Sequence, residues 1–354
     1  MEVRVLVLGL ALLLISASIH LWSWPVEEAP PEAVPGTPSE PETWPETAGE
    51  KRAEVEVEEH RYLVMEAILF ENNLTEEVED TVYVLLPRND TYQESFLLNS
   101  TIDVDRILVD EEGNSIGVFK VRLKPGETAW LNLTYRVIMK SYRVRLDYEL
   151  ARWPDLDHVA EYTSPTTFWN TENETIRSIA DRVAGALDNP AAIAEELAAW
   201  AASHVQYVPM ERVGSDSAIR ISGGREVIFG DCEEVADVYI TMARYLGVPA
   251  RSAYGFLLVD LPVIYWYRRG ESLEETASHW GGHTWPQVYV PPWGWIDVEM
   301  LEGFVPKVGD YSWRHILFGV ESKWVSGASM ADRYIGSWYL TDLYIELRIY
   351  PAQD

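Results

Sequence analysis

The sequence predicts an α+β fold in which an all-β sandwich precedes a domain of helices packed against an antiparallel sheet. Three observations support this prediction. Apolar and polar residues alternate along residues 53–150, as they do in half-buried strands. After residue 170 the apolar residues recur at helical spacing, and strand-like segments return from residue 250 onward. With 354 residues, the chain is long enough for two such domains.

An apolar segment opens the chain. Residues 1–24 are long enough to cross a bilayer as a helix. Arg4 lies near their start, whereas Glu27 and Glu28 follow them, which predicts a transmembrane anchor with the rest of the chain outside the cytoplasm, at the cell surface. A signal peptide cleaved near the small residues at 16–18 is the alternative, and it would give a secreted protein.

Residues 25–52 are predicted to form a stalk. Seven prolines and seven glutamates within residues 25–50 give a composition that cannot bury a core and favours an extended chain. Asn-x-Ser/Thr triplets after the apolar segment support export and predict a glycoprotein. These triplets begin at Asn73, Asn89, Asn99, Asn132 and Asn173.

Composition and charge limit the classes of partner. Hydrophobic residues make up 47% of the chain, which includes 15 Trp and 19 Tyr, so we expect a large aromatic core. The formal net charge of −29 excludes nucleic acid as a partner, because a phosphate backbone binds to a cationic surface.

The single cysteine, Cys232, lies in the first turn of a helix predicted over residues 231–246. Asp231 is a good N-cap, and Glu234 completes a capping box. The helix N-terminus lowers the pKa of a thiol placed there, whereas Glu233 and Glu234 raise it unless they point outward. Export favours disulfides, yet a lone cysteine cannot form one within the chain. The choice is between a reactive thiol and an inert buried one.

A nucleophilic thiol needs a base, and His283 is the best candidate. It opens a predicted strand in which its imidazole shares a face with Trp285. The next predicted strand offers Asp297 and Glu299, also on one shared face. A carboxylate there can orient the ring and stabilise the imidazolium. Pro286 predicts that the histidine strand lies at a sheet edge, because proline lacks the ladder N–H.

These segments resemble the transglutaminase-like superfamily of thiol enzymes, in its prokaryotic branch. The resemblance rests on "GDCEEVADVYITMARYLGVPARSAYGF", "HTWPQVYV" and "GWIDVE" in this order, and it covers about residues 170–305. It implies a papain-like packing of helix on sheet, with Cys232 as nucleophile, His283 as its base and Glu299 as the residue that orients the base. The family usually has Asp where this chain has Glu299, so Asp297 is kept as the alternative.

The resemblance also implies the reaction. Cys232 would attack an amide carbonyl of a protein or peptide substrate and form a thioester, and no cofactor is implied. The outcome is peptide or isopeptide hydrolysis, which an exported and water-exposed site favours, or transfer to an amine. One alternative is a non-catalytic cell-surface binding or scaffold protein with a degenerate domain. Another is a zinc site made by Cys232, His279, His283 and an acid, although structural zinc usually brings paired cysteines.

The predicted organisation of the chain has five parts. They are an anchor or signal peptide (1–24), a stalk (25–52), a β-sandwich domain (53–150), a transglutaminase-like catalytic domain (151–305) and a C-terminal β extension of that domain (306–354). The segment 260–282 is longer than most connections between adjacent strands, so it is either a substrate-gating loop or a solvated insertion.

Overall fold

The structure is a computed structural model of the chain. It describes residues 55–155, 158–321 and 335–352. The anchor and stalk predicted over residues 1–24 and 25–52 lie outside the described residues. Within the described part of the chain, no helix has both the length and the apolar character that crossing a membrane requires.

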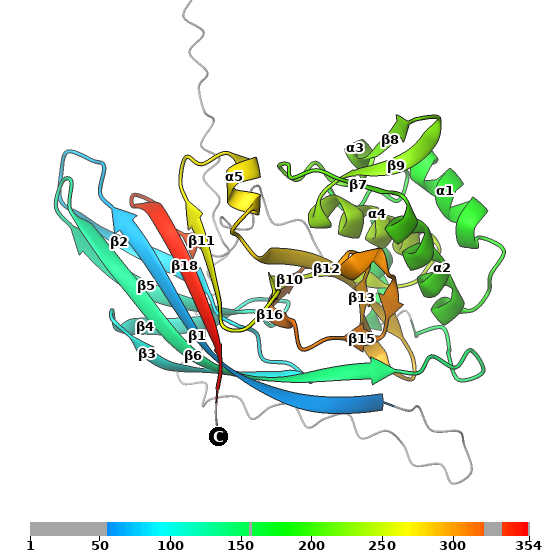
Figure 1. The fold of residues 1–354 in the computed structure, drawn as a ribbon, viewed down its shortest axis with the longest axis horizontal. Coiled ribbons are helices and arrows are strands. Elements are labelled where there is room, and N and C mark those ends of the chain that lie inside the picture. The colour runs from blue at the N-terminus through cyan, green and yellow to red at the C-terminus, as the bar shows by residue number, and fades with distance from the viewer. Residues whose placement is uncertain (1–54, 156–157, 322–334, 353–354) are drawn as a thin grey trace, which may run out of the picture. The chain divides into compact units, whose positions relative to one another are not determined.

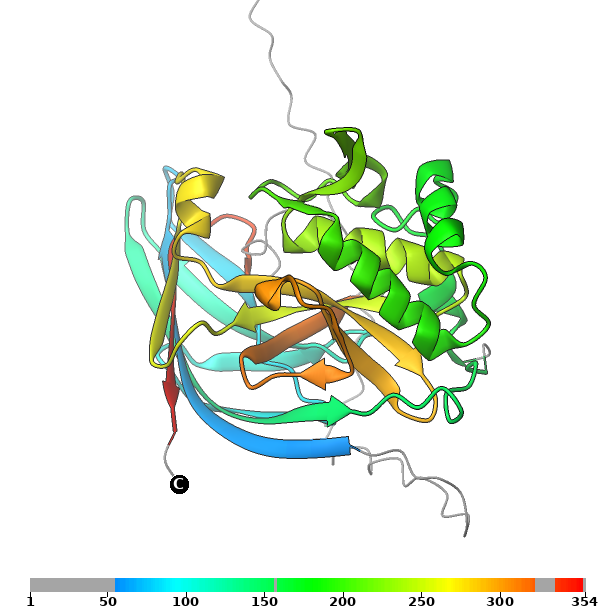
Figure 2. The same ribbon diagram turned by 45° about the vertical axis from the view of Figure 1, so that its right-hand side comes forward.

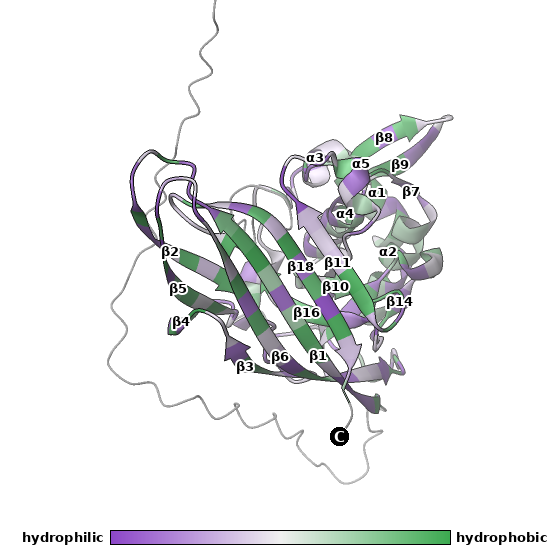
Figure 3. Ribbon diagram, turned by 60° about the vertical axis from the view of Figure 1, so that its left-hand side comes forward, coloured by the Kyte–Doolittle hydropathy of each residue, from purple (hydrophilic) through white to green (hydrophobic). Residues whose placement is uncertain are grey.

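Six strands occupy the region predicted to be an all-β sandwich. They are β1 (Val55–Glu71), β2 (Val78–Leu85), β3 (Gln93–Ser100), β4 (Val104–Val109), β5 (Ser115–Leu123) and β6 (Thr128–Val144). The structure divides them between two antiparallel sheets, with β1, β6 and β3 in one and β2, β5 and β4 in the other. From Tyr62 onward in β1 and from Leu131 to Met139 in β6, every second residue is buried, and Figure 3 shows hydrophobic and hydrophilic residues interspersed along these strands.

Helices follow from residue 160 onward. They are the α-helices α1 (Glu174–Ala184), α2 (Pro190–Ser203), α3 (Ser215–Ala218), α4 (Cys232–Tyr245) and α5 (Leu273–Ala277), with the 3-10 turns η2 (Ala160–Thr163) and η3 (Glu302–Phe304). Asn189 caps α2 by accepting bonds from two backbone amides, and proline occupies the first helical position. Asp231 caps α4, and Glu234 completes a capping box. The predicted caps of α4 are therefore confirmed.

The remaining strands come mostly after α4. They are β7 (Val205–Tyr207), β8 (Ile219–Ser222), β9 (Arg225–Gly230), β10 (Ala250–Leu257), β11 (Val263–Arg268), β12 (Gly282–Val290), β13 (Gly294–Glu299), β14 (Lys307–Val308), β15 (Asp310–Tyr311), β16 (His315–Glu321), β17 (Ile335–Gly336) and β18 (Thr341–Pro351). One antiparallel sheet has the order β14-β13-β12-β10-β16, and we call it the five-stranded sheet. The described chain is thus α+β, as predicted.

The five-stranded sheet lies between two layers. Figures 1 and 2 show the helices α1, α2 and α4 on one side of it and the long strands β1 and β6 on the other. α4 packs against β12 and β10. On the opposite side, the end of β6 pairs with β15, and its Tyr142 donates a hydrogen bond to Asp297 of β13. Side chains of β12 and β13 are therefore covered from both sides.

Three strands from the second half of the described chain, β11, β15 and β18, join the sheet that contains β1. β18 pairs with β1, and β11 pairs with β18. The predicted C-terminal extension, residues 306–354, is consequently split, because β16 pairs with β10 of the five-stranded sheet while β18 does not. The segment 260–282, predicted as a loop or insertion, contributes the strand β11 and the short helix α5.

The prediction that Pro286 marks an edge strand is wrong. β12 lies inside the five-stranded sheet, with β10 on one side and β13 on the other. Pairing with β13 begins at Gln287, so Pro286 lies just outside the β12–β13 ladder. The N–H that proline lacks therefore removes no hydrogen bond from that ladder.

Candidate active site

Cys232 is the first residue of α4, directly after the cap Asp231, and its exposed fraction is 8%. The Asp231 carboxylate accepts a bond of 3.0 Å from the amide of Glu233, and the Glu234 carboxylate accepts one of 3.1 Å from the amide of Asp231. Gly230 has a φ of 155°, and a Cβ there would lie 2.4 Å from Cγ of Glu234. The glycine of the Gly-Asp-Cys sequence is thus required by this close approach.

The pKa of the Cys232 thiol is raised well above its ordinary value. Burial is the largest cause, and the charges of Asp231, Glu233 and Glu234 add to it, while a backbone hydrogen bond from Thr284 acts in the opposite direction. Both glutamates are buried rather than pointing outward, so the condition for a lowered thiol pKa is not met, and their charges raise it, as expected from the sequence in that case. The resting group is a thiol, and it reacts only if a base removes its proton.

His283 lies on β12, is almost fully buried, and stacks on Trp285 with ring centroids 5.6 Å apart. Its Nε2 is 2.8 Å from Oε2 of Glu299 on β13. Since the carboxylate accepts the Nε2–H, the lone pair of the neutral ring is on Nδ1. This is the tautomer in which Nδ1 can take a proton.

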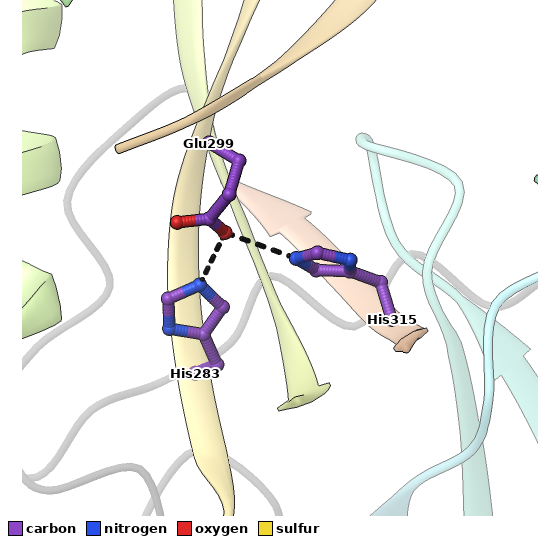
Figure 4. A group of neighbouring side chains, drawn as sticks. All are labelled: His283, Glu299 and His315. Atoms are coloured by element: carbon purple, nitrogen blue, oxygen red, sulfur yellow. Dashed lines mark hydrogen bonds and ion pairs between the residues drawn. The ribbon is translucent and has the colours of Figure 1, made fainter. Parts of the chain in front are cut away.

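The carboxylate of Glu299 is bound on both oxygens. Oε2 contacts Nε2 of His283 at 2.8 Å and Nε2 of His315 at 3.0 Å, an arrangement drawn in Figure 4. Oε1 accepts bonds from the amides of Leu301 at 2.6 Å and Glu302 at 3.1 Å. Burial alone would raise the pKa of Glu299, but the charges and hydrogen bonds of the two histidines hold it well below its ordinary value.

Asp297, the alternative orienting residue, has other partners. Its carboxylate accepts bonds from Nε1 of Trp285 at 2.6 Å and Nε2 of Gln287 at 2.9 Å, and also from the hydroxyl of Tyr142. The structure therefore places Glu299 on the imidazole of His283, and it places Asp297 two residues earlier on β13, opposite Gln287.

Cys232, His283 and Glu299 line one tight pocket at the start of α4. Its walls are Cys232, Val235, His283, Thr284, Trp285, Pro286, Val298, Glu299, Met300 and Leu301. Three of the four residues predicted from the sequence are brought together there, although they come from a helix and two strands. Asp297 does not line this pocket.

Sequence reasoning did not find His315, Tyr142 or Tyr207. His315 binds Glu299 from β16, and Tyr142 binds Asp297 from β6, 155 positions away in the chain. Tyr207 is half-exposed on β7, paired with Gly230, and partial burial and the charges of Cys232 and Asp231 raise its pKa. No local pattern marks any of the three, because each acts through contacts between distant segments.

Among the residues that the structure describes, one group of side chains could hold a metal ion. His283, Glu299 and His315 each offer a donor atom, these atoms lie within 4.8 Å of one another, and two imidazoles with a carboxylate suit zinc. The zinc set predicted from the sequence is not assembled in the described part of the chain. His279 instead contacts the carbonyl of Trp266 at 2.7 Å and the carboxylate of Glu271 at 3.0 Å.

Comparisons with known proteins give a family for part of the chain. Residues 177–300 match the family model described as the transglutaminase-like superfamily. This range contains Cys232, His283 and Glu299. None of the curated proteins matches the sequence.

Two solved structures are among those similar to the chain. The structure named "Putative Cysteine Protease from Cytophaga hutchinsonii" has a TM-score of 0.54 and 13% identity, over 85% of this chain and 93% of that one. The periplasmic domain of TgpA from Pseudomonas aeruginosa has a TM-score of 0.33 and 16% identity, over 65% of this chain and 71% of that one. The first structure shows that most of this chain has a fold similar to one already solved.

Proposed function

Residues 177–300 form a transglutaminase-like domain, and from this premise we propose that the protein is a cysteine-dependent enzyme that transfers acyl groups from amide bonds. One observation carries the proposal. A thiol at a helix N-terminus and an imidazole whose Nε2 is held by a buried carboxylate line the same pocket. These are the nucleophile, base and orienting group of thiol-dependent acyl transfer.

The proposed reaction has two halves. Nδ1 of His283 takes the proton of Cys232, and Sγ forms a bond to the amide carbonyl carbon. The C–N bond breaks as the imidazolium gives its proton to the departing amine, which leaves a thioester. Water or a second amine then attacks the thioester carbonyl, gives its proton to Nδ1, and releases the product as the proton returns to Sγ.

Glu299 and the start of α4 would support both halves. The Glu299 carboxylate, bonded to Nε2 of His283, would stabilise the imidazolium and leave Nδ1 to accept the proton of Cys232. The backbone N–H of Cys232, at the first position of α4, is the natural donor to the oxygen that becomes negative in the tetrahedral intermediate. The high pKa of the thiol fits a mechanism in which proton removal accompanies substrate attack.

The substrate class proposed is a protein or peptide amide, with hydrolysis favoured over transfer to an amine. Casein as acyl donor and dansylcadaverine as acceptor separate the two outcomes: hydrolysis gives new termini or released ammonia, and transfer gives fluorescent casein. Either product must disappear in Cys232→Ser. A product that persists in this variant, or no product with casein and no reaction of native Cys232 with iodoacetamide, contradicts the proposal.

A metal-dependent function is the second candidate, because His283, Glu299 and His315 present two imidazoles and a carboxylate. Elemental analysis of the purified full chain decides between them. Stoichiometric zinc, lost with activity on chelation and retained in Cys232→Ser, favours metal chemistry over thiol chemistry. A non-catalytic binding protein is distinguished by a thiol that reacts with iodoacetamide only after unfolding.

The location belongs to the same proposal. The apolar residues 1–24 would hold the enzyme at the outer face of a membrane, or be removed to release it. Protease treatment of intact cells, with the protein detected through a C-terminal tag, tests this. Digestion without lysis, or recovery from the medium, supports the proposed location, and full protection contradicts it.

A further inference from the structure

A second imidazole shares the carboxylate that holds His283. We propose that His315 is a positioning residue for the candidate active site, which fixes the Glu299 carboxylate so that a glutamate can orient His283. This inference rests on the proposed function. It adds a residue that lies outside the matched range 177–300.

The need for a second anchor follows from the glutamate itself. A glutamate side chain has one more rotatable bond than an aspartate, so its carboxylate must lose more rotational freedom to hold one position. Glu299 is 2% exposed, and its Oε1 is held by the amides of Leu301 and Glu302. Oε2 is the oxygen that faces His283, and His315 binds this same oxygen at 3.0 Å (Figure 4). Four donors therefore hold the two oxygens in place.

His315 is itself rigidly held. It is 1% exposed, and its ring meets the edge of Trp285 with centroids 4.9 Å apart. Trp285 also stacks on His283, so one indole contacts both imidazoles. Gly255 of β10 lets β16 approach closely, because a Cβ there would lie 1.9 Å from the carbonyl oxygen of Ile316. The fold thus fixes where the second imidazole lies.

The hydrogen bonds also fix which ring nitrogen carries the proton. The Ser312 hydroxyl lies 3.1 Å from Nδ1 of His315 and can donate to it. Nε2 then carries the hydrogen that the Glu299 carboxylate accepts. With both imidazoles donating through Nε2, the lone pair of His283 stays on Nδ1, the nitrogen that must take the proton of Cys232. Without His315, Oε2 is held by His283 alone, and the position of the carboxylate depends on the two amides that bind Oε1.

The test is the second-order rate constant for alkylation of the native full chain by iodoacetamide. Cys232 is the only cysteine, so intact mass reports its reaction alone. We expect His315→Leu to slow the reaction about tenfold or more, in the range of a lost general-base contribution. His315→Gln keeps an N–H donor near the position of Nε2, and we expect it to restore the rate to within about threefold of the wild type.

A double-mutant cycle separates positioning from a purely structural role. Glu299→Asp withdraws the carboxylate from at least one imidazole, so His315→Leu in that background should change the rate less than about twofold. His279→Leu is the matched control, since His279 also pairs with a glutamate but lies outside the pocket. Thermal unfolding of each variant checks that it is folded.

Each outcome has one meaning. Equal rates for wild type and folded His315→Leu overturn the inference, and so does a His315→Gln variant as slow as His315→Leu. If His315→Leu does not fold, the alkylation rates of His315→Gln and Ser312→Ala decide. A slow His315→Gln variant together with a Ser312→Ala variant that reacts at the wild-type rate contradicts the inference. Native wild type that does not react at all overturns the proposed function and this inference together, whereas a reactive wild type with an indifferent His315 overturns only the inference.

Discussion

Two buried glutamates, in two different sheets, have pKa values shifted in opposite directions. Glu66 of β1 is 3% exposed, accepts a bond of 3.0 Å from the hydroxyl of Tyr135, and has its pKa raised to about 7 by burial. Glu299 of β13 is equally buried, yet two histidines hold its pKa well below the ordinary value. The two side chains are equally buried, so their hydrogen-bond partners determine the direction of the pKa shift.

The difference separates the roles of the two regions. In the sheet of β1, the Glu66 carboxyl accepts a bond from Tyr135, and burial makes its neutral form more favourable. In the five-stranded sheet, the fold supplies two imidazoles and two amides around one carboxylate. A buried carboxylate that stays charged because this many hydrogen-bond donors surround it is typical of a functional site rather than of a core.

The largest effect is expected from Glu299→Gln. Loss of the charge removes the group that stabilises the His283 imidazolium, so iodoacetamide should react with native Cys232 about 100-fold more slowly. Because the folded pKa of Glu299 is lowered, its charge stabilises the fold above its ordinary pKa near 4.5, and this contribution is lost as the pH falls below that value. Urea unfolding should show the variant approaching the wild type at low pH.

The control is Glu302→Gln, which removes a neighbouring charge paired with Lys307 rather than with a histidine. The alkylation rate of this variant should stay within about twofold of the wild-type rate, because a partly exposed ion pair contributes little. A Glu299→Gln variant that reacts like this control would remove the carboxylate from the proposed mechanism.

The next effect concerns Glu66, whose contribution to the unfolding free energy changes with pH in the opposite direction to that of Glu299. Its folded pKa of about 7 lies above the ordinary 4.5, so the native state holds the proton more tightly and stability falls as the pH rises between these values. From pH 5 to pH 8 the wild type should lose about 3 kcal/mol more unfolding free energy than Glu66→Gln. Parallel pH profiles from urea unfolding would show that Glu66 is not the cause.

A smaller effect on reactivity is expected from Asp297→Asn. Asp297 binds Trp285, Gln287 and Tyr142, so the variant should lower the unfolding free energy by about 2 kcal/mol. The alkylation rate of Cys232 should fall less than about fivefold, because the imidazole keeps Glu299. A rate as low as that of Glu299→Gln would make Asp297 the orienting residue.

The smallest effect is expected from Tyr142→Phe. The hydroxyl donates to the Asp297 carboxylate and accepts from the Asp297 amide, both buried. Removal should lower the unfolding free energy by about 1 to 2 kcal/mol with little change in alkylation. An alkylation rate reduced tenfold would instead link β6 directly to the reactivity of the thiol.

Local patterns predicted much of the site. Asp231 and Glu234 identified the N-terminus of α4 because a capping box uses only neighbouring residues. The two-residue period of a strand put His283 and Trp285 on one face and put both Asp297 and Glu299 on a shared face, whereas the preference for Glu299 came from the family resemblance. These expectations depend on spacing along the chain, which the sequence displays directly.

Contacts between distant segments were not predictable in the same way. His315 reaches Glu299 only because β16 pairs with β10, and no motif around it indicates that pairing. The burial of Glu233 and Glu234, which decides the direction of the Cys232 pKa shift that the sequence left open, depends on what packs over the start of α4. Register between remote strands is a tertiary property, and sequence spacing alone does not fix it.

The central claim is that His283 makes the buried thiol of Cys232 reactive, and the most direct measurement compares native wild type with His283→Gln. Both are treated with iodoacetamide at neutral pH and followed by intact mass, with unfolded samples as the measure of total thiol. We predict that wild type gains one carbamidomethyl group under native conditions while the variant reacts only after unfolding. Equal native reaction of the two proteins, or none in either, would contradict the claim.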